Sequence, residues 1–187
     1  MTATRLILAA LLLAAPLSAL AQPATAPPPA IPNPTYTPLV LEIAVNRPAA
    51  QTWAKVGGFC AIKEWLGGQS CVITSGVEGE LGSVRLLNGT VIEPLVAKTD
   101  RSYTYSQPVR VGVPFNAYHA TLEAKRVTAT TSKLVYSFFY DNSMLASDAA
   151  RATEATNRRA RFGEGLQNMK ILAEGGTLPP PPPPAAR

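Results

Sequence analysis

The sequence predicts an α+β fold in which a curved antiparallel sheet of about seven strands wraps around one long C-terminal helix, with two short helices after the first strand. Three observations predict it: an alternating apolar stretch with two short helical segments before residue 66, a succession of β segments up to residue 140, and a helical apolar repeat after residue 147. Strands joined by short turns pair antiparallel. Because a curved sheet and a helix cannot touch everywhere, a ligand cavity is expected between them.

Residues 1–21 have the pattern of a secretory signal peptide. Arg5 supplies the positive start, Leu6–Ala15 form an apolar run too short to span a bilayer, and Ala19–Ala21 fit a small-x-small cleavage site. The alternative is an anchor helix that stays attached. Cleavage predicts a periplasmic or secreted bacterial protein.

Proline-rich segments flank the predicted domain on both sides. Residues 22–38 are expected to form a linker and residues 177–187 a disordered tail, both extended or without regular structure. The tail could also be a ligand for a proline-binding module. Residues 39–176 remain as one domain, which is long enough for a hydrophobic core.

The charge balance is mildly basic, with 17 Lys+Arg against 12 Asp+Glu. No basic stripe crosses the predicted strands, so nucleic acid is not an expected partner, whereas weak attraction to a membrane surface is compatible with the charge. One histidine and two cysteines do not furnish a typical closed zinc site, and no nucleotide-binding or hydrolase motif is present. We therefore predict no metal or other cofactor, and the oligomeric state stays open.

The first elements are a strand over residues 39–45 and a helix that begins at Pro48 and buries Trp53. Gly57-Gly58 then interrupts the helix, and aromatic and apolar residues recur at three-residue spacing up to Trp65. The second short helix should therefore bury one face. We call residues 56–65 the wedge, and expect it to close one end of the cavity.

Six further strands are predicted from alternation and turn residues, one hairpin being marked by Asn88-Gly89. They cover residues 70–77, 82–87, 90–99, 102–109, 117–127 and 133–140. Ser147 or Asp148 then caps the long helix, which ends at Gly175-Gly176. Its predicted buried face consists of Ala152, Ala155, Arg159, Phe162, Leu166 and Met169.

Short motifs along the chain also resemble a known family. In order they are Pro48-x4-Trp53, Val56-Gly57-Gly58-Phe59, Trp65, Cys71, Gly82-x-Val84-Arg85, Glu93-x-Leu95, Ser102-Tyr103-x-Tyr105 and Asn116-x-Tyr118-x-Ala120-Thr121-Leu122. Their order and spacing resemble the polyketide cyclase/dehydrase branch of the START-like superfamily, also called SRPBCC, across residues 39–172. The resemblance implies the helix-grip fold and a cavity that serves cyclases or lipid carriers. Pro94 departs from the basic or polar residue usual in the family, and the exported, proline-flanked context differs from its cytoplasmic members.

Arg85 and Glu93 lie on the two arms of the Asn88-Gly89 hairpin. A two-residue turn would place them on opposite faces, and a three-residue turn with a bulge at Gly89 would place them on the same face. The resemblance favours the second arrangement, with both side chains in the cavity. They would then hold a ligand carboxylate or carbonyl, with Glu93 as the candidate general base; the alternative is a structural ion pair.

Aromatic residues would line the rest of the cavity. The resemblance turns Tyr105, Tyr118, Tyr136 and Phe138 inward from adjacent strands, with Trp65 on the wedge side and Phe162 on the helix side. The alternative is an ordinary packed core. His119 should point outward beside the inward Tyr118, which argues against a catalytic histidine.

Cys60 and Cys71 are the only cysteines, and an even count in an exported protein predicts a disulfide between them. The alternative is a pair of reduced, buried thiols.

Three functions follow from these observations. The leading one is an exported binding protein for a small apolar or amphipathic ligand, such as a lipid, an aromatic compound or a polyketide-like molecule. The second is a cyclase or dehydratase that uses cavity polar groups as acid and base. The third is an interaction protein with a filled core.

Overall fold

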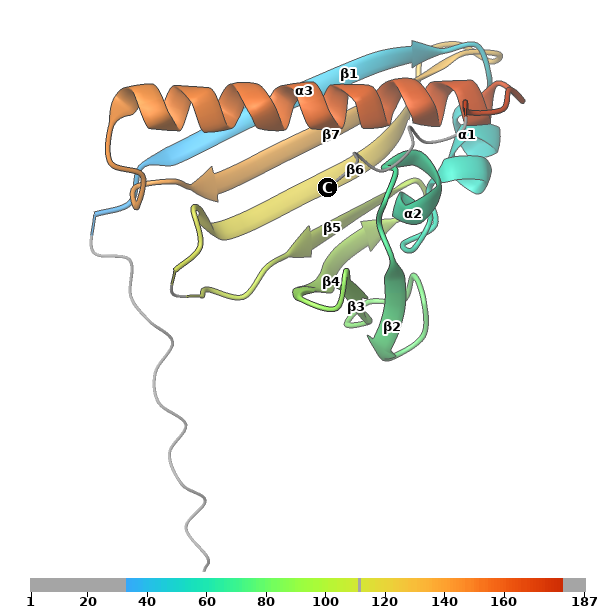
Figure 1. Ribbon diagram of the computed structural model, residues 1–187. Helices are drawn as coiled ribbons and strands as arrows, with labels where there is room; N and C mark the ends of the chain where they lie inside the picture. The colour runs from blue at the N-terminus through green and yellow to red at the C-terminus, as the bar shows by residue number, and fades with distance from the viewer. Residues whose placement is uncertain (1–32, 111, 180–187) are drawn as a thin grey trace, which may run out of the picture.

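The computed structural model describes residues 33–110 and 112–179, and it confirms the α+β helix-grip architecture. The elements in chain order are β1 (Tyr36–Val45), α1 (Ala49–Val56), α2 (Ile62–Trp65), β2 (Cys71–Ser75), β3 (Val84–Leu87), β4 (Val91–Thr99), β5 (Ser102–Ser106), β6 (Asn116–Arg126), β7 (Ser132–Asp141) and α3 (Asp148–Ala173). Seven antiparallel strands form one sheet in the order β1-β7-β6-β5-β4-β3-β2, and α3 lies along its β1–β7 side (Figure 1). The predicted signal peptide, most of the linker and most of the tail lie outside the described residues.

Several predicted boundaries differ from the observed ones. β1 begins at Tyr36, inside the predicted linker 22–38, because residues 36–38 pair with the end of β7. β2 stops at Ser75 because Gly76 has a φ of 74° and leaves the extended conformation. β5 stops at Ser106, since Pro108 has no N–H to continue the ladder.

Side chains of α3 cover the free edge of β1. Arg159 Nη1 donates to the Val40 carbonyl at 3.3 Å, and Lys170 Nζ donates to the Ala44 carbonyl at 2.9 Å. The backbone N–H just after β1, at Asn46, donates to Glu174 Oε1 at 2.8 Å. Since unpaired edge groups are a template for strand addition, these contacts protect the edge as well as fastening the helix.

The predicted buried face of α3 is correct only in part. Ala152 and Arg159 are exposed, and the buried positions are Phe162, Gly165, Leu166 and Met169. In the N-terminal half of the helix, Arg158 lies against aromatic rings in place of Arg159. Arg158 faces inward there because its guanidinium packs on the rings of Phe115 and Tyr140, which come from other elements and could not be placed from the pattern of the helix alone.

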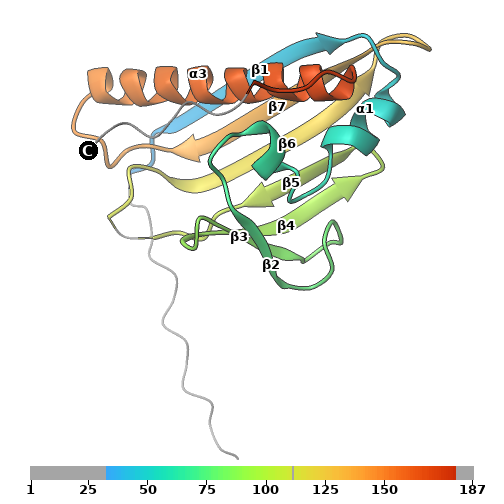
Figure 2. The same cartoon turned by 45° about the vertical axis from the view of Figure 1, so that its right-hand side comes forward.

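The wedge lies beneath the C-terminal half of α3, as the two views in Figures 1 and 2 show. Trp65 is fully buried, whereas Trp53, predicted as core, is half-buried. The indole of Trp53 lies on Gly57, where a Cβ would be 2.3 Å from the ring, so only glycine fits. The Cys60–Cys71 disulfide is confirmed, with a Cα–Cα distance of 5.6 Å, and it fastens the wedge to the short edge strand β2.

Within residues 33–110 and 112–179, no helix combines the length and apolarity that crossing a membrane requires.

Candidate functional site

The β3–β4 hairpin places Arg85 and Glu93 directly opposite each other. They are register partners, and Leu87 pairs with Val91 across a three-residue loop. The first two loop residues, Asn88 and Gly89, have φ values of 50° and 68°. The prediction of a three-residue turn with both side chains on one face is therefore confirmed.

Arg85 and Glu93 form an ion pair inside the core. Arg85 Nε donates to Glu93 Oε2 at 2.7 Å, and Arg85 Nη1 donates to the Phe59 carbonyl of the wedge. The other carboxylate oxygen, Glu93 Oε1, accepts from Gln107 Nε2 at 2.7 Å. The Arg85 guanidinium carbon lies 4.2 Å from the centre of the Phe59 ring and 4.7 Å from that of Tyr105. The pair thus ties the hairpin to the wedge.

Burial raises the pKa of the Glu93 carboxyl, and Arg85 and Gln107 oppose that rise. Both members of the pair are almost completely shielded, with 0% of Arg85 and 3% of Glu93 exposed. Neither residue lines the two pockets described below. The role of Glu93 as a general base stays a prediction.

The aromatic residues predicted to line a cavity contact one another. The Tyr105 and Tyr136 hydroxyls are 2.7 Å apart, and the Phe162 ring centre lies 5.2 Å from that of Tyr136 and 4.5 Å from that of Phe138. Trp65 is edge-on to Tyr136 at 6.1 Å. All are buried. Of the eight predicted ligand-binding residues, Phe162 alone lines either of these two pockets, so the role of the others stays a prediction.

The larger of the two pockets lies beside the N-terminal half of α3 and has a volume of about 620 Å³. Its lining residues are Phe115, Ala150, Thr153, Glu154, Asn157, Arg158, Arg161 and Phe162. We call it the α3 pocket. Phe115 precedes β6 directly, so the pocket is formed where the β5–β6 loop meets the helix.

A charged pair forms the base of the α3 pocket. Arg158 Nε donates to Glu154 Oε1 at 2.8 Å, and the Tyr140 hydroxyl donates to Glu154 Oε2 at 2.7 Å. The Arg158 guanidinium carbon lies 4.3 Å from the centre of the Phe115 ring and 4.4 Å from that of Tyr140. Arg161 is exposed at the rim and forms no ion pair with any described carboxylate. The group formed by Glu154, Arg158 and Arg161 therefore carries a net positive charge.

Our prediction from the sequence missed this group. Glu154 and Arg158 are four residues apart, the spacing of a helical ion pair, which was the available signal. The same spacing is typical of a solvated ion pair on an exposed helix face. Only the tertiary contacts with Phe115 and Tyr140 distinguish the Glu154–Arg158 pair from such a pair.

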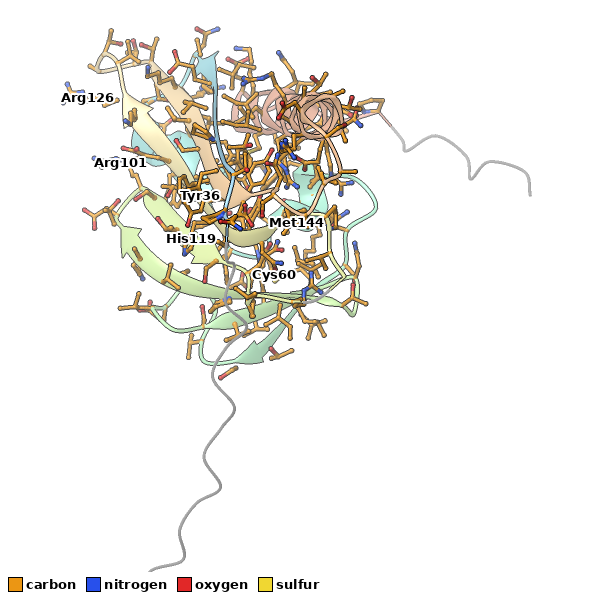
Figure 3. The ribbon with its side chains drawn as sticks, turned by 90° about the vertical axis from the view of Figure 1, so that its left-hand side faces the viewer. Tyr36, Cys60, Arg101, His119, Arg126 and Met144 are labelled. Carbon is orange, nitrogen blue, oxygen red and sulfur yellow. A yellow bond between two sulfur atoms is a disulfide. The ribbon has the colours of Figure 1, made fainter. Side chains whose placement is uncertain are left out.

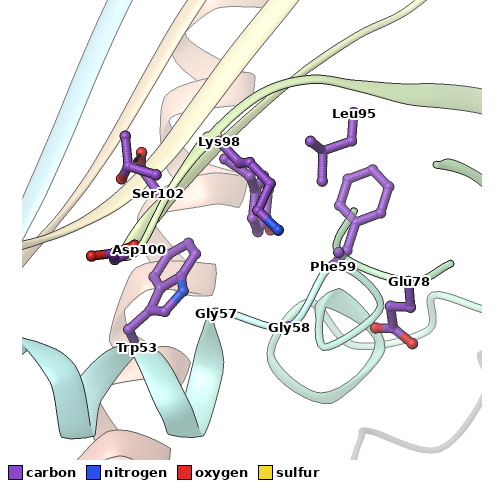
Figure 4. Close-up of a pocket in the computed structure, with 12 residues that line it drawn as sticks. Trp53, Gly57, Gly58, Phe59, Glu78, Leu95, Lys98, Asp100 and Ser102 are labelled. Atoms are coloured by element: carbon purple, nitrogen blue, oxygen red, sulfur yellow. Dashed lines mark hydrogen bonds between the residues drawn. The ribbon is translucent and has the colours of Figure 1, made fainter. Parts of the chain in front are cut away.

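A second pocket, of about 440 Å³, lies between α1, the wedge and the β4–β5 hairpin (Figure 4). Two of its charged side chains are held by the scaffold: Glu78 Oε1 accepts from the Cys60 backbone N–H at 2.8 Å, and Lys98 Nζ lies 3.2 Å from Glu80 Oε1. Among the described residues, no group of three histidine, cysteine or acidic side chains could hold a metal ion. His119 is exposed, as expected.

Alkaline pH should unfold the protein through its buried tyrosines. Burial raises the pKa of Tyr103, Tyr105, Tyr118 and Tyr136 in the folded state, and burial with the Glu154 hydrogen bond raises that of Tyr140 to about 12. A raised folded-state pKa means that stability is intact below about pH 10, the unfolded pKa, and falls as the pH rises above it. Tyrosinate absorbance and circular dichroism should change together. Early ionisation of several tyrosines in folded protein would contradict this prediction.

Comparisons with known proteins agree with the fold. The family described as polyketide cyclase/dehydrase and lipid transport matches residues 38–174. No curated protein matches the chain.

Three solved structures illustrate the likeness. A solution structure from Thermobifida fusca is 22% identical with a TM-score of 0.63, covering 75% of this chain and 97% of that one. The Zhui aromatase/cyclase from Streptomyces sp. R1128 is 15% identical with a TM-score of 0.61, covering 76% and 100%. Norcoclaurine synthase from Thalictrum flavum is 11% identical with a TM-score of 0.59, covering 77% and 97%. At these identities the likeness concerns the fold alone.

Proposed function

Because the chain belongs to the family described as polyketide cyclase/dehydrase and lipid transport, we propose that it binds a small amphipathic molecule with an anionic end, in the α3 pocket. The observation that carries the proposal is the combination, in that pocket, of two aromatic walls with a net positive group.

The size and walls of the pocket suit an apolar body. Its volume of about 620 Å³ falls within the range of roughly 300–1,000 Å³ typical of small-molecule sites. Two aromatic side chains line it, Phe115 from the β5–β6 loop and Phe162 from α3. A chain or ring that covers both rings removes apolar surface from water.

The charges suit an anionic end. Glu154 already accepts hydrogen bonds from Tyr140 and Arg158, so its charge is compensated within the protein. Arg161 is available at the rim, and a guanidinium binds a carboxylate or phosphate with paired hydrogen bonds. A neutral or cationic molecule of the same shape would lose this interaction.

Export is part of the proposal. The Cys60–Cys71 disulfide is the state expected in an oxidising compartment. The signal-peptide pattern of residues 1–21 supports the same location. We therefore place the binding function outside the bacterial cytoplasm.

A second candidate function is acid–base catalysis of the cyclase or dehydratase type. The raised pKa of the buried Glu93 carboxyl favours it, since burial makes the carboxylate a better proton acceptor than an exposed one. This function requires the ligand to reach Glu93 from the α3 pocket, past Phe162 and Tyr136. An interaction protein with a filled core is the remaining candidate.

Titration calorimetry with dodecanoate, below its micelle concentration, tests the binding proposal. Dodecanoate should bind, dodecanol should bind more weakly, and Arg161→Gln should weaken dodecanoate binding by about tenfold, the loss of one charged hydrogen bond. Arg101→Gln, which removes an exposed arginine elsewhere, is the matched control and should change nothing. Equal affinities for dodecanoate and dodecanol would remove the anionic end from the proposal, and no binding of either would contradict it.

A further inference from the structure

We propose that the α3 pocket prefers acyl chains that carry a hydroxyl group close to their carboxylate, and that Asn157 is the residue that selects them. This preference rests on the proposed function, because it concerns the ligand of the same pocket. It goes beyond that function by naming the class of ligand, a hydroxylated fatty acid.

Asn157 lines the pocket from the middle of its helical wall. Thr153 comes four residues before it and Arg161 four residues after it, and both also line the pocket. Residues four apart in an α-helix lie on the same face, about 6 Å apart along the axis. Figure 3 looks along α3 from the end at which the helix begins, and shows Arg101, the control for Arg161, on the opposite side of the view. Asn157 is therefore the next polar position along this row from the group expected to hold the anionic end.

The neighbouring polar side chains of the lining are already engaged within the protein. Glu154 accepts hydrogen bonds from Tyr140 and Arg158. The Thr153 hydroxyl donates to a backbone carbonyl one turn back in the helix, at 2.9 Å. Asn157 differs from them, because its side-chain amide makes no hydrogen bond to any residue in the described part of the chain. Its donor and its acceptor are both available to a ligand.

An available amide in the lining favours a ligand with a hydrogen-bonding group of its own. A plain acyl chain that covers Asn157 would remove water from the amide and replace none of the hydrogen bonds, which weakens binding. A hydroxyl group both donates and accepts, as the amide does, so it can replace the lost water. The lining therefore discriminates between acyl chains with and without a hydroxyl group at this position.

The hydroxyl group should be close to the carboxylate. Side chains of an α-helix lean toward its N-terminus, so Arg161 leans over the turn that contains Asn157. A carboxylate bound by the Arg161 guanidinium would then have only a few ligand atoms between it and the Asn157 amide. A hydroxyl group on the third carbon of the chain fits this spacing, whereas one at the far end of a twelve-carbon chain does not.

Titration calorimetry with three acids of equal chain length tests the preference: dodecanoate, 3-hydroxydodecanoate and 12-hydroxydodecanoate. The 3-hydroxy acid should bind about fivefold more tightly than dodecanoate, the gain expected of one neutral hydrogen bond, and the 12-hydroxy acid should show no gain. Asn157→Leu should bind dodecanoate more tightly than the parent does, and 3-hydroxydodecanoate more weakly. Thr156→Ala, which changes the adjacent exposed residue outside the lining, is the control and should keep the parent's preference.

Opposite changes for the two acids in Asn157→Leu would support the role of Asn157, since a variant that disturbed the fold would weaken the binding of both. Equal affinities of the parent for dodecanoate and 3-hydroxydodecanoate would overturn the preference and leave the proposed function standing, because dodecanoate would still bind. A preference that Asn157→Leu retains would overturn the assignment to Asn157. No binding of any of the three acids would contradict the proposed function itself.

Discussion

Replacing Glu93 by glutamine should lower the free energy of unfolding by about 3–5 kcal/mol, because it leaves the charge of Arg85 buried without its counter-ion. Arg85 is fully shielded, and its remaining acceptor is the Phe59 carbonyl in the wedge. In the parent protein Gln107 Nε2 donates to Glu93 Oε1, so the amide introduced at this position would also have to face the Gln107 amide. Urea denaturation followed by circular dichroism measures the loss. Glu80→Gln, which removes the exposed partner of Lys98, is the control and should have little effect.

The same variant separates the two interpretations of the pair. If Glu93 belongs to the scaffold, Glu93→Gln should lose stability and still bind dodecanoate under conditions where it stays folded. If Glu93 acts on a ligand, binding or activity should change while the unfolding transition stays in place. That second result would contradict the stability prediction and restore Glu93 as the candidate acid or base.

Removing the Cys60–Cys71 disulfide should lower the free energy of unfolding by about 3 kcal/mol. The bond closes a short loop and so reduces the conformational entropy of the unfolded chain. The bond spans a sequence separation of 11 residues and fastens the wedge to β2. Because Phe59 is adjacent to Cys60 and accepts a hydrogen bond from Arg85, loss of the bond should also loosen the support of the Arg85–Glu93 pair. Urea denaturation of the parent with and without reductant measures the effect.

The double variant Cys60→Ser/Cys71→Ser is the matched control for the reductant. It should unfold at the lower urea concentration under both conditions, and the reduced parent should approach it. An unchanged transition in the reduced parent would show that the disulfide contributes little to stability.

Local patterns were enough to predict the elements and their order. Alternation predicted the strands, Asn88-Gly89 predicted the hairpin, and the repeat ending at Met169 predicted the buried part of α3. These signals are local because each depends on residues that are close together in the chain. Boundaries were less accurate, as at Tyr36, because pairing with a distant strand decides where an edge strand begins.

The candidate site was predictable only in part. The hairpin alone left the facing of Arg85 and Glu93 open and the family resemblance favoured one face, whereas their contacts with Gln107 and the Phe59 carbonyl were not predicted. The α3 pocket was missed altogether, since Phe115, Tyr140 and Arg158 come from separate elements and meet only after folding.

The sequence by itself determined the fold class of this protein, because periodicity and turn chemistry act over a few residues, and its even cysteine count predicted the disulfide. The inward orientation of the aromatic residues was implied by the family resemblance. Only the tertiary structure decided that those aromatic residues contact one another and that Arg158 replaces Arg159 on the inner side of α3. The reason is that burial of a long side chain depends on the surfaces that surround it, and these come from distant parts of the chain.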